Sequence, residues 1–215
     1  MSGADPRTDP NPARARLIDH FKRAYQIIVG LAITLACTKL FSSESTLSFW
    51  LFCTFFVTVV PIFHGGDRSL DVKYLDARPQ GFGQRASYIW DVYMLLITAV
   101  IFVKLAQAIP GAGLGGGTTA AGPQEFYRWM TILMVFDIAV LAIDRFKTAL
   151  LYPQQSRLAA YLPWGVLNAA LALVCGLASL YPAWLGTEIE SLAVFVLALL
   201  RTILDYCFGS DFLFP

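Results

Sequence analysis

The sequence predicts an all-α integral membrane protein, a bundle of about six transmembrane helices with both termini in the cytoplasm. Hydrophobic residues make up 57% of the chain and charged residues 14%, whereas a soluble domain carries about 25% charged residues. The apolar residues form continuous runs, which indicate helices rather than the alternating strands of a barrel. Lysine and arginine gather in alternate links between the runs, a distribution typical of a multi-pass membrane protein.

The apolar runs divide the chain into six expected spans, each near the length of about 20 residues that a bilayer core requires. These spans are expected at 24–41, 47–63, 87–109, 126–147, 162–181 and 188–207. A disordered polar and basic tail is expected over residues 1–23, a cytoplasmic loop over 64–86 and an apolar tail over 208–215. Because the fourth and sixth runs contain charges, a protein of four or five spans with one interfacial helix is the alternative.

The links between the spans predict the orientation. Residues 42–46, 110–125 and 182–187 contain no lysine or arginine, whereas the N-terminal segment and the other links contain several. By the positive-inside rule the basic side is cytoplasmic. We therefore expect both termini inside the cell, and the plasma (inner) membrane as the location.

The stretch PIFHGGDRSLD, residues 61–71, joins the end of the second apolar run to a dense polar segment. Glycine is unfavourable in a helix interior, so we expect Gly65 and Gly66 to break the second helix. Asp67 would then be the N-cap of a short interfacial helix. If the helix instead continued, one of its faces would carry three polar residues, namely His64, Arg68 and Asp71.

Charged residues inside the predicted spans are the candidates for function. Asp137 lies near mid-bilayer in the fourth span, where an aspartate raises the free energy of membrane insertion by about 2.5 to 3.5 kcal/mol. Asp144 follows on the same face of that span, Asp91 lies about one turn into the third span, and Asn168 lies in the cytoplasmic half of the fifth. We expect Asp137, Asp144 and Asp91 to line a transport path.

The alternative for Asp137 is a structural lock, which requires a cationic partner. The candidate partners are four basic residues in or beside the spans, namely Lys39, Lys104, Arg128 and Arg145. If they do not pair with Asp137, Lys39 and Lys104 are expected to extend from the outer ends of the first and third spans to the lipid headgroups.

A charge network is also expected at the cytoplasmic ends of the helices. Its expected members are Arg68, Arg145, Arg201 and Asp205. Arg201 and Asp205 are four residues apart on the sixth span and can pair directly. Asp205 needs such a cation, because the helix macrodipole disfavours an anion near a helix C-terminus.

These residues are compatible with three classes of function. The leading interpretation is a small transport or permeation protein, an ion- or proton-linked channel or carrier with a polar cytoplasmic vestibule. The first alternative is a membrane-embedded enzyme that acts on a lipid headgroup at the cytoplasmic face, with His64, Asp67 and Asp71 as catalytic residues. The second is a membrane scaffold or assembly subunit in which every charge is structural.

Composition also limits which partners, cofactors and metals are expected. The net charge of +1 argues against a nucleic-acid partner, whereas the lipid bilayer is an expected partner and a homo-oligomer or a partner subunit is compatible with so small a chain. We expect no cofactor and no metal, because the chain has only two histidines and four isolated cysteines. Gly111, Gly113 and Gly116 match the pattern G-x-G-x-x-G, but they lie in a low-complexity link and predict a flexible loop instead.

Overall fold

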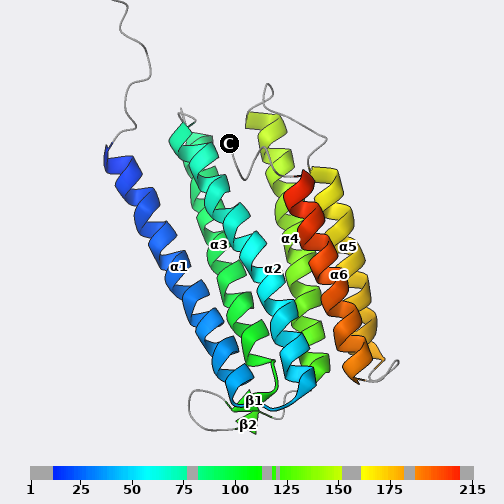
Figure 1. Cartoon of the computed structure of the whole chain (residues 1–215). Helices are drawn as coiled ribbons and strands as arrows, with labels where there is room; N and C mark the ends of the chain where they lie inside the picture. The colour runs from blue at the N-terminus through cyan, green and yellow to red at the C-terminus, as the bar shows by residue number, and fades with distance from the viewer. Residues whose placement is uncertain are drawn as a thin grey trace, which may run out of the picture.

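The computed structural model describes residues 12–76, 82–112, 118–119, 122–151, 161–181 and 187–208. Six long helices run side by side over this part of the chain (Figure 1). They are α1 Pro12–Phe41, α2 Thr46–Leu70, α3 Phe82–Gln107, α4 Pro123–Leu151, α5 Tyr161–Leu180 and α6 Thr187–Phe208. Each contains a stretch long and apolar enough to cross a membrane, so the prediction of a helical protein with six such segments is confirmed.

Three short elements complete the described structure. A π-helix, η1 (Asp71–Asp76), continues directly from α2. The strands β1 (Gly111–Ala112) and β2 (Thr118–Thr119) pair antiparallel in the link between α3 and α4. The sequence predicts a flexible loop for this link. The strand pairing shows that this prediction is wrong for residues 111–112 and 118–119.

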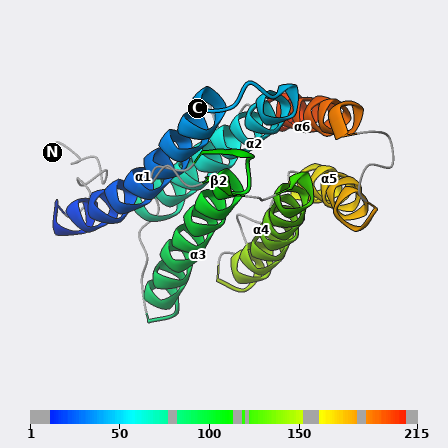
Figure 2. The same ribbon diagram turned by 90° about the horizontal axis from the view of Figure 1, so that it is seen from below.

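The six helices form two groups of three. Figure 2 shows α1, α2 and α3 on one side of the bundle and α4, α5 and α6 on the other. The groups meet along two seams, where α2 packs on α6 and α3 packs on α4. Large apolar side chains such as Phe55, Phe102 and Phe126 are fully buried in the core.

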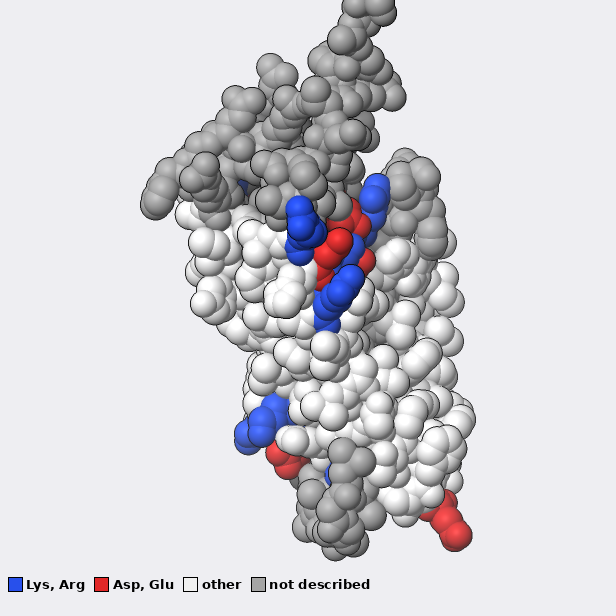
Figure 3. Space-filling view, turned by 90° about the vertical axis from the view of Figure 1, so that its left-hand side faces the viewer, with Lys and Arg blue, Asp and Glu red and all other residues white. Residues whose placement is uncertain are grey.

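The outer surface of the bundle has the polarity of a membrane protein. Large apolar side chains such as Ile27, Leu173 and Ile189 are more than 60% exposed. Figure 3 shows lysine, arginine and acidic side chains gathered near one end of the bundle, above a broad uncharged belt. Because bulk water does not favour so much exposed apolar surface, the helices indicate an integral multi-pass membrane protein.

Two helices extend well beyond the expected spans. Helix α1 begins at Pro12 rather than at residue 24, and proline is well suited to the first turn because its missing N–H would have no partner there. Residues 64–76, expected as part of a loop, are helical in α2 and η1. The expected tail over 1–23 is therefore helical from residue 12, whereas the apolar tail from residue 209 onward lies outside the described residues.

The expected break at the paired glycines is wrong, and tertiary packing supplies the reason. A Cβ built at Gly66 would lie 2.6 Å from Leu95 Cδ2, so the glycine lets α2 approach α3 closely. Beyond the glycines, Lys22 Nζ of α1 lies 2.9 Å from Asp67 Oδ2 and 3.0 Å from Asp71 Oδ2. These two ion pairs hold the helix extension against α1, and their stabilisation opposes the low helix propensity of glycine.

Pro61 lies inside α2 without ending it. Proline has no N–H, so the carbonyl oxygen of Val57, four residues earlier, loses its helical donor. The Thr202 hydroxyl of α6 donates a hydrogen bond to that oxygen at 2.6 Å. The carbonyl group freed by Pro61 therefore forms a polar contact across the seam with α6. Such a side-chain partner is expected where no water is available to the backbone.

Lys39 is buried at the end of α1 rather than exposed there. It is 1% exposed, and its Nζ donates to the carbonyl oxygen of Gly111 at 3.4 Å. Gly111 has φ of +141°, and a Cβ there would lie 2.6 Å from the carbonyl oxygen of Lys39. The end of α1 and the start of β1 therefore pack backbone against backbone, which only glycine permits.

We expect Gly111→Ala to lower the free energy of unfolding by about 1 to 3 kcal/mol, because the side chain would meet backbone and the φ angle is unfavourable for alanine. Gly65→Ala is the matched control, since a Cβ at this helical position meets nothing within 4 Å. The control should leave stability unchanged or raise it. Thermal melting in one detergent compares the two, and equal melting temperatures would contradict the packing at Gly111.

Candidate functional site

Four polar side chains from three helices form a largely buried cluster, which we call the core polar cluster: Asp137 of α4, Asn168 of α5, and Arg201 and Asp205 of α6. Asn168 Nδ2 donates to Asp137 Oδ2 at 2.5 Å. Arg201 Nε donates to Asn168 Oδ1 at 2.9 Å. Arg201 Nη1 lies 2.6 Å from Asp205 Oδ2, so the expected pairing across one helical turn is confirmed.

Three of the four residues of this cluster are closed to solvent, and Asp137 is half-buried. Asn168 is fully buried, and Arg201 and Asp205 are each 5% exposed. Asn168 occupies the middle of the chain of contacts, with its amide nitrogen on one acid and its amide oxygen on the guanidinium. It therefore orients Asp137 and Arg201 relative to each other through one rigid amide plane.

The charges of the core polar cluster do not balance. The positive charge of Arg201 attracts both Asp137 and Asp205, and the negative charges of the two aspartates repel each other. With both carboxyls ionised, the cluster would carry one negative charge more than positive ones. In addition, Asp205 Oδ1 is buried and has no hydrogen-bond partner among the described residues. A buried uncompensated charge costs several kcal/mol, so the cluster favours one additional positive charge, such as a proton.

A second group of charges lies where α2 and α4 end and α3 begins, and we call it the end cluster: Lys73, Asp91, Asp144 and Lys147. Lys73 Nζ lies 2.5 Å from Asp144 Oδ1 and 3.6 Å from Asp91 Oδ2. Lys147 Nζ binds Asp91 Oδ1 and lies 3.8 Å from Asp144 Oδ1. The Tyr74 hydroxyl donates to Asp91 Oδ2 at 2.7 Å.

The end cluster differs from the core polar cluster in two respects. Its two lysines and two aspartates balance in charge, and their side chains are 13% to 27% exposed. Charge pairs that reach water are individually weak, but this network ties η1, α3 and α4 together at one end of the bundle. We therefore interpret the end cluster as a structural network that holds these helix ends together.

The structure divides the expected path between the two clusters. Asp91 and Asp144 meet through the lysines of the end cluster, whereas Asp137 belongs to the core polar cluster. The hydrogen-bond donor to Asp137 is Asn168, which corrects the expected choice among Lys39, Lys104, Arg128 and Arg145.

The expected charge network is divided as well. Arg201 and Asp205 lie in the core. Arg145 is exposed and forms no ion pair with another described residue, whereas Arg68 is half-buried on α2. Among the described residues, the Arg201–Asp205 pair of this expected network is thus formed without Arg145.

The residues expected for catalysis are engaged elsewhere. Asp67 and Asp71 both bind Lys22. His64 is half-buried, and its Nδ1 lies 3.5 Å from the Tyr206 hydroxyl of α6. Among the residues with a described placement, no three His, Cys, Asp or Glu side chains are grouped closely enough to hold a metal ion.

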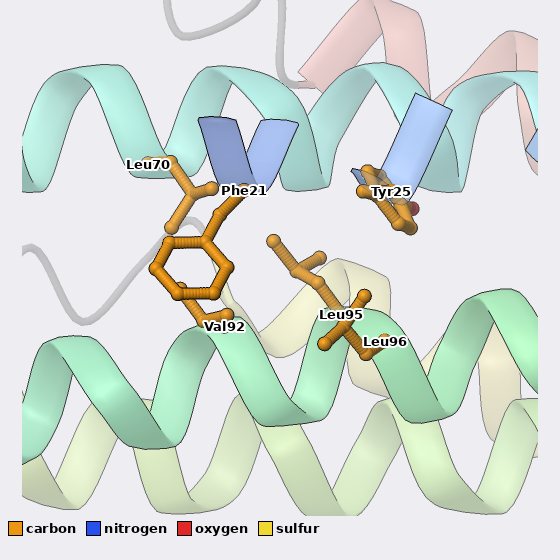
Figure 4. Close-up of a pocket in the computed structure, with 6 residues that line it drawn as sticks. All are labelled: Phe21, Tyr25, Leu70, Val92, Leu95 and Leu96. Atoms are coloured by element: carbon orange, nitrogen blue, oxygen red, sulfur yellow. The ribbon is translucent and has the colours of Figure 1, made fainter. Parts of the chain in front are cut away.

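A small apolar space lies between α1, α2 and α3 (Figure 4). Its volume is about 10 Å³, and its lining residues are Phe21, Tyr25, Leu70, Val92, Leu95 and Leu96. A cavity needs about 10 to 15 Å³ and several polar partners to hold even one water molecule. This apolar space is therefore too small for a substrate.

No family model, no curated protein and no solved structure matches this chain. The interpretation of the site therefore rests on its geometry and on its place in a membrane-spanning bundle.

Sequence reasoning missed several residues of these clusters. The sequence marks Lys22, Lys73 and Lys147 only as part of the basic segments beside the spans, although each binds two aspartates in the structure. Nothing in the linear pattern shows these pairings, because the partners of Lys22 and Lys73 are distant in the chain. Asn168 was a detectable signal, since an amide inside an apolar span requires a polar neighbour.

Proposed function

We propose that this integral membrane protein is a small proton-linked transport protein, and that the core polar cluster carries the proton. The observation that supports this proposal is one guanidinium for two carboxyls: Arg201 pairs with the buried Asp205 and is linked through Asn168 to the half-buried Asp137. Ionisable residues inside a membrane bundle are costly and typically belong to proton or ion pathways. A proton is the smallest ligand that removes the excess negative charge.

The proposed mechanism uses the exchange of one proton at the carboxyls. When one carboxyl is protonated, the cluster is neutral and stable in the closed bundle. When the proton leaves to water, the excess negative charge is stabilised only where water can reach the cluster. Protonation therefore biases the bundle between closed and water-accessible arrangements, and the seams between the two groups of three helices are the surfaces that would separate.

We also propose that both termini are cytoplasmic and that the membrane is the plasma (inner) membrane. The basis is the alternation of lysine and arginine among the links. The end cluster then lies on the cytoplasmic side, where it closes the bundle.

Cysteine labelling tests this orientation. In a background without the native cysteines, Asp76→Cys at the end of η1 should be protected from a membrane-impermeant maleimide added to intact cells. Gly115→Cys, at a position outside the described residues, should be labelled. The reverse pattern would show that the termini face outward.

Proton flux into liposomes tests the proposed function. Liposomes that contain the purified protein are loaded with potassium and a pH-sensitive dye, and valinomycin then sets a potential that drives protons inward. We expect the internal pH to fall faster than in liposomes that contain equal amounts of the Asp137→Asn variant. A folded wild-type protein that conducts no protons above that background would overturn the proposal and would favour a scaffold or assembly subunit.

A further inference from the structure

Arg128 is an exposed cation of α4 that belongs to neither the core polar cluster nor the end cluster. It lies close to the start of α4 at Pro123, whereas the end cluster lies where this helix ends. Within the part of the chain that the structure describes, Arg128 forms no ion pair. The nearest acid on its helix, Glu125, is one turn closer to the helix start and does not pair with it. Arg128 therefore presents a positive charge at the end of the bundle opposite the end cluster.

An open apolar groove begins one turn further along α4 than Arg128. Its volume is about 420 Å³, and its lining residues are Thr131, Ile132, Val135, Phe136 and Ala139. Thr131 does not make the groove polar, because its hydroxyl donates to the carbonyl oxygen of Tyr127 at 2.9 Å within the helix. The groove lies in the segment of α4 that is long and apolar enough to cross a membrane. Hydrocarbon rather than water is therefore expected to fill it.

The arginine and the groove lie on one face of α4. This face consists of residues at intervals of four, three and four, namely Arg128, Ile132, Val135 and Ala139. All four are exposed, while α3 and α5 pack against other sides of the helix. From Arg128 to Ala139 the helix rises by about 16 Å, which is close to half of a hydrocarbon core about 30 Å thick. The arginine and the groove therefore match the headgroup and the acyl chain of one lipid in one leaflet.

We propose that this face of α4 binds one anionic phospholipid, with the lipid phosphate at Arg128 and an acyl chain in the groove. A guanidinium binds a phosphate through two parallel N–H···O bonds, so its charge and shape fit this headgroup. A zwitterionic headgroup carries its own cation beside the phosphate and gains less from the arginine. The proposal does not depend on proton transport, because it uses only the surface of a membrane-spanning helix.

Lipid binding to the purified protein in detergent tests the charge. Native mass spectrometry measures the dissociation constant of the first bound lipid, with phosphatidylglycerol or phosphatidylcholine of identical acyl chains. The wild type should bind phosphatidylglycerol more tightly. Arg128→Gln should weaken that binding about fivefold, which corresponds to the 1 kcal/mol, roughly, that a basic residue contributes beside anionic lipid, and should leave phosphatidylcholine binding unchanged. Arg145→Gln is the matched control and should bind as the wild type does, because Arg145 is equally an exposed cation of α4 but lies near the other end of the helix.

Ala139→Trp tests the groove separately from the charge. Ala139 is exposed, so the indole should fill the groove without lowering the melting temperature, and binding of both lipids should weaken. Ala170→Trp, at an exposed alanine of α5 outside the groove lining, should change neither. Equal binding of the two lipids by the wild type, unchanged binding in Arg128→Gln or Ala139→Trp, or an equal loss in Arg145→Gln would overturn the proposal. A lipid-free dimer that Ala139→Trp converts to a monomer would also overturn it, in favour of a second copy of the chain in the groove.

Discussion

Replacing Arg201 with alanine is expected to lower the free energy of unfolding by about 3 to 5 kcal/mol, the usual cost of leaving a buried charge without its partner. The guanidinium contacts Asp205 at 2.6 Å and Asn168 at 2.9 Å, and it is 5% exposed. Its loss leaves two carboxyls in the core with no cation beside them. Arg201 is buried among apolar helices, so in the closed bundle water has little access to replace it.

Arg145→Ala is the matched control for this variant. Arg145 is exposed on α4 and forms no ion pair with the other described residues, so its loss should leave the melting temperature nearly unchanged. Thermal melting of both variants in one detergent should separate them by about 10 °C. Equal melting temperatures would mean that water reaches Arg201 and that the core polar cluster is not sealed.

Asp137→Asn is expected to abolish proton flux while leaving the protein as stable as the wild type, or more stable. Asparagine keeps the size and the acceptor oxygen of aspartate, so Asn168 retains a partner, but it cannot bind or release a proton at neutral pH. One carboxyl then remains beside one guanidinium, so the charges of the cluster balance. The expected stability change is therefore opposite in sign to that of Arg201→Ala, although both substitutions affect the same cluster.

Asp19→Asn is the control for the second variant, because Asp19 is an exposed aspartate of α1. It should keep the wild-type flux in the same liposome assay. A marked drop in the melting temperature of Asp137→Asn would identify Asp137 as a structural lock. A stable Asp137→Asn protein with normal flux would remove Asp137 from the proton pathway.

The sequence alone determined the helical architecture and the number of membrane-compatible segments. A bilayer leaves backbone N–H and C=O groups no partner except within the segment, so apolar runs of this length predict helices. The Arg201–Asp205 pair was also predictable, since residues four apart on one helix are neighbours whatever the packing. The sequence also indicated that Asp137 has a specific partner or role, because an aspartate at the bilayer centre raises the free energy of membrane insertion.

Only the tertiary structure decided which helices supply those partners. Asp137 meets Asn168, and Asp67 meets Lys22, because of how each helix is rotated about its axis and which neighbour it packs against. Hydropathy does not contain that information, since an apolar run can present any face to lipid. The same reason explains the error at Gly66: a glycine that reads as a break in one helix is, beside Leu95, the position that lets two helices meet.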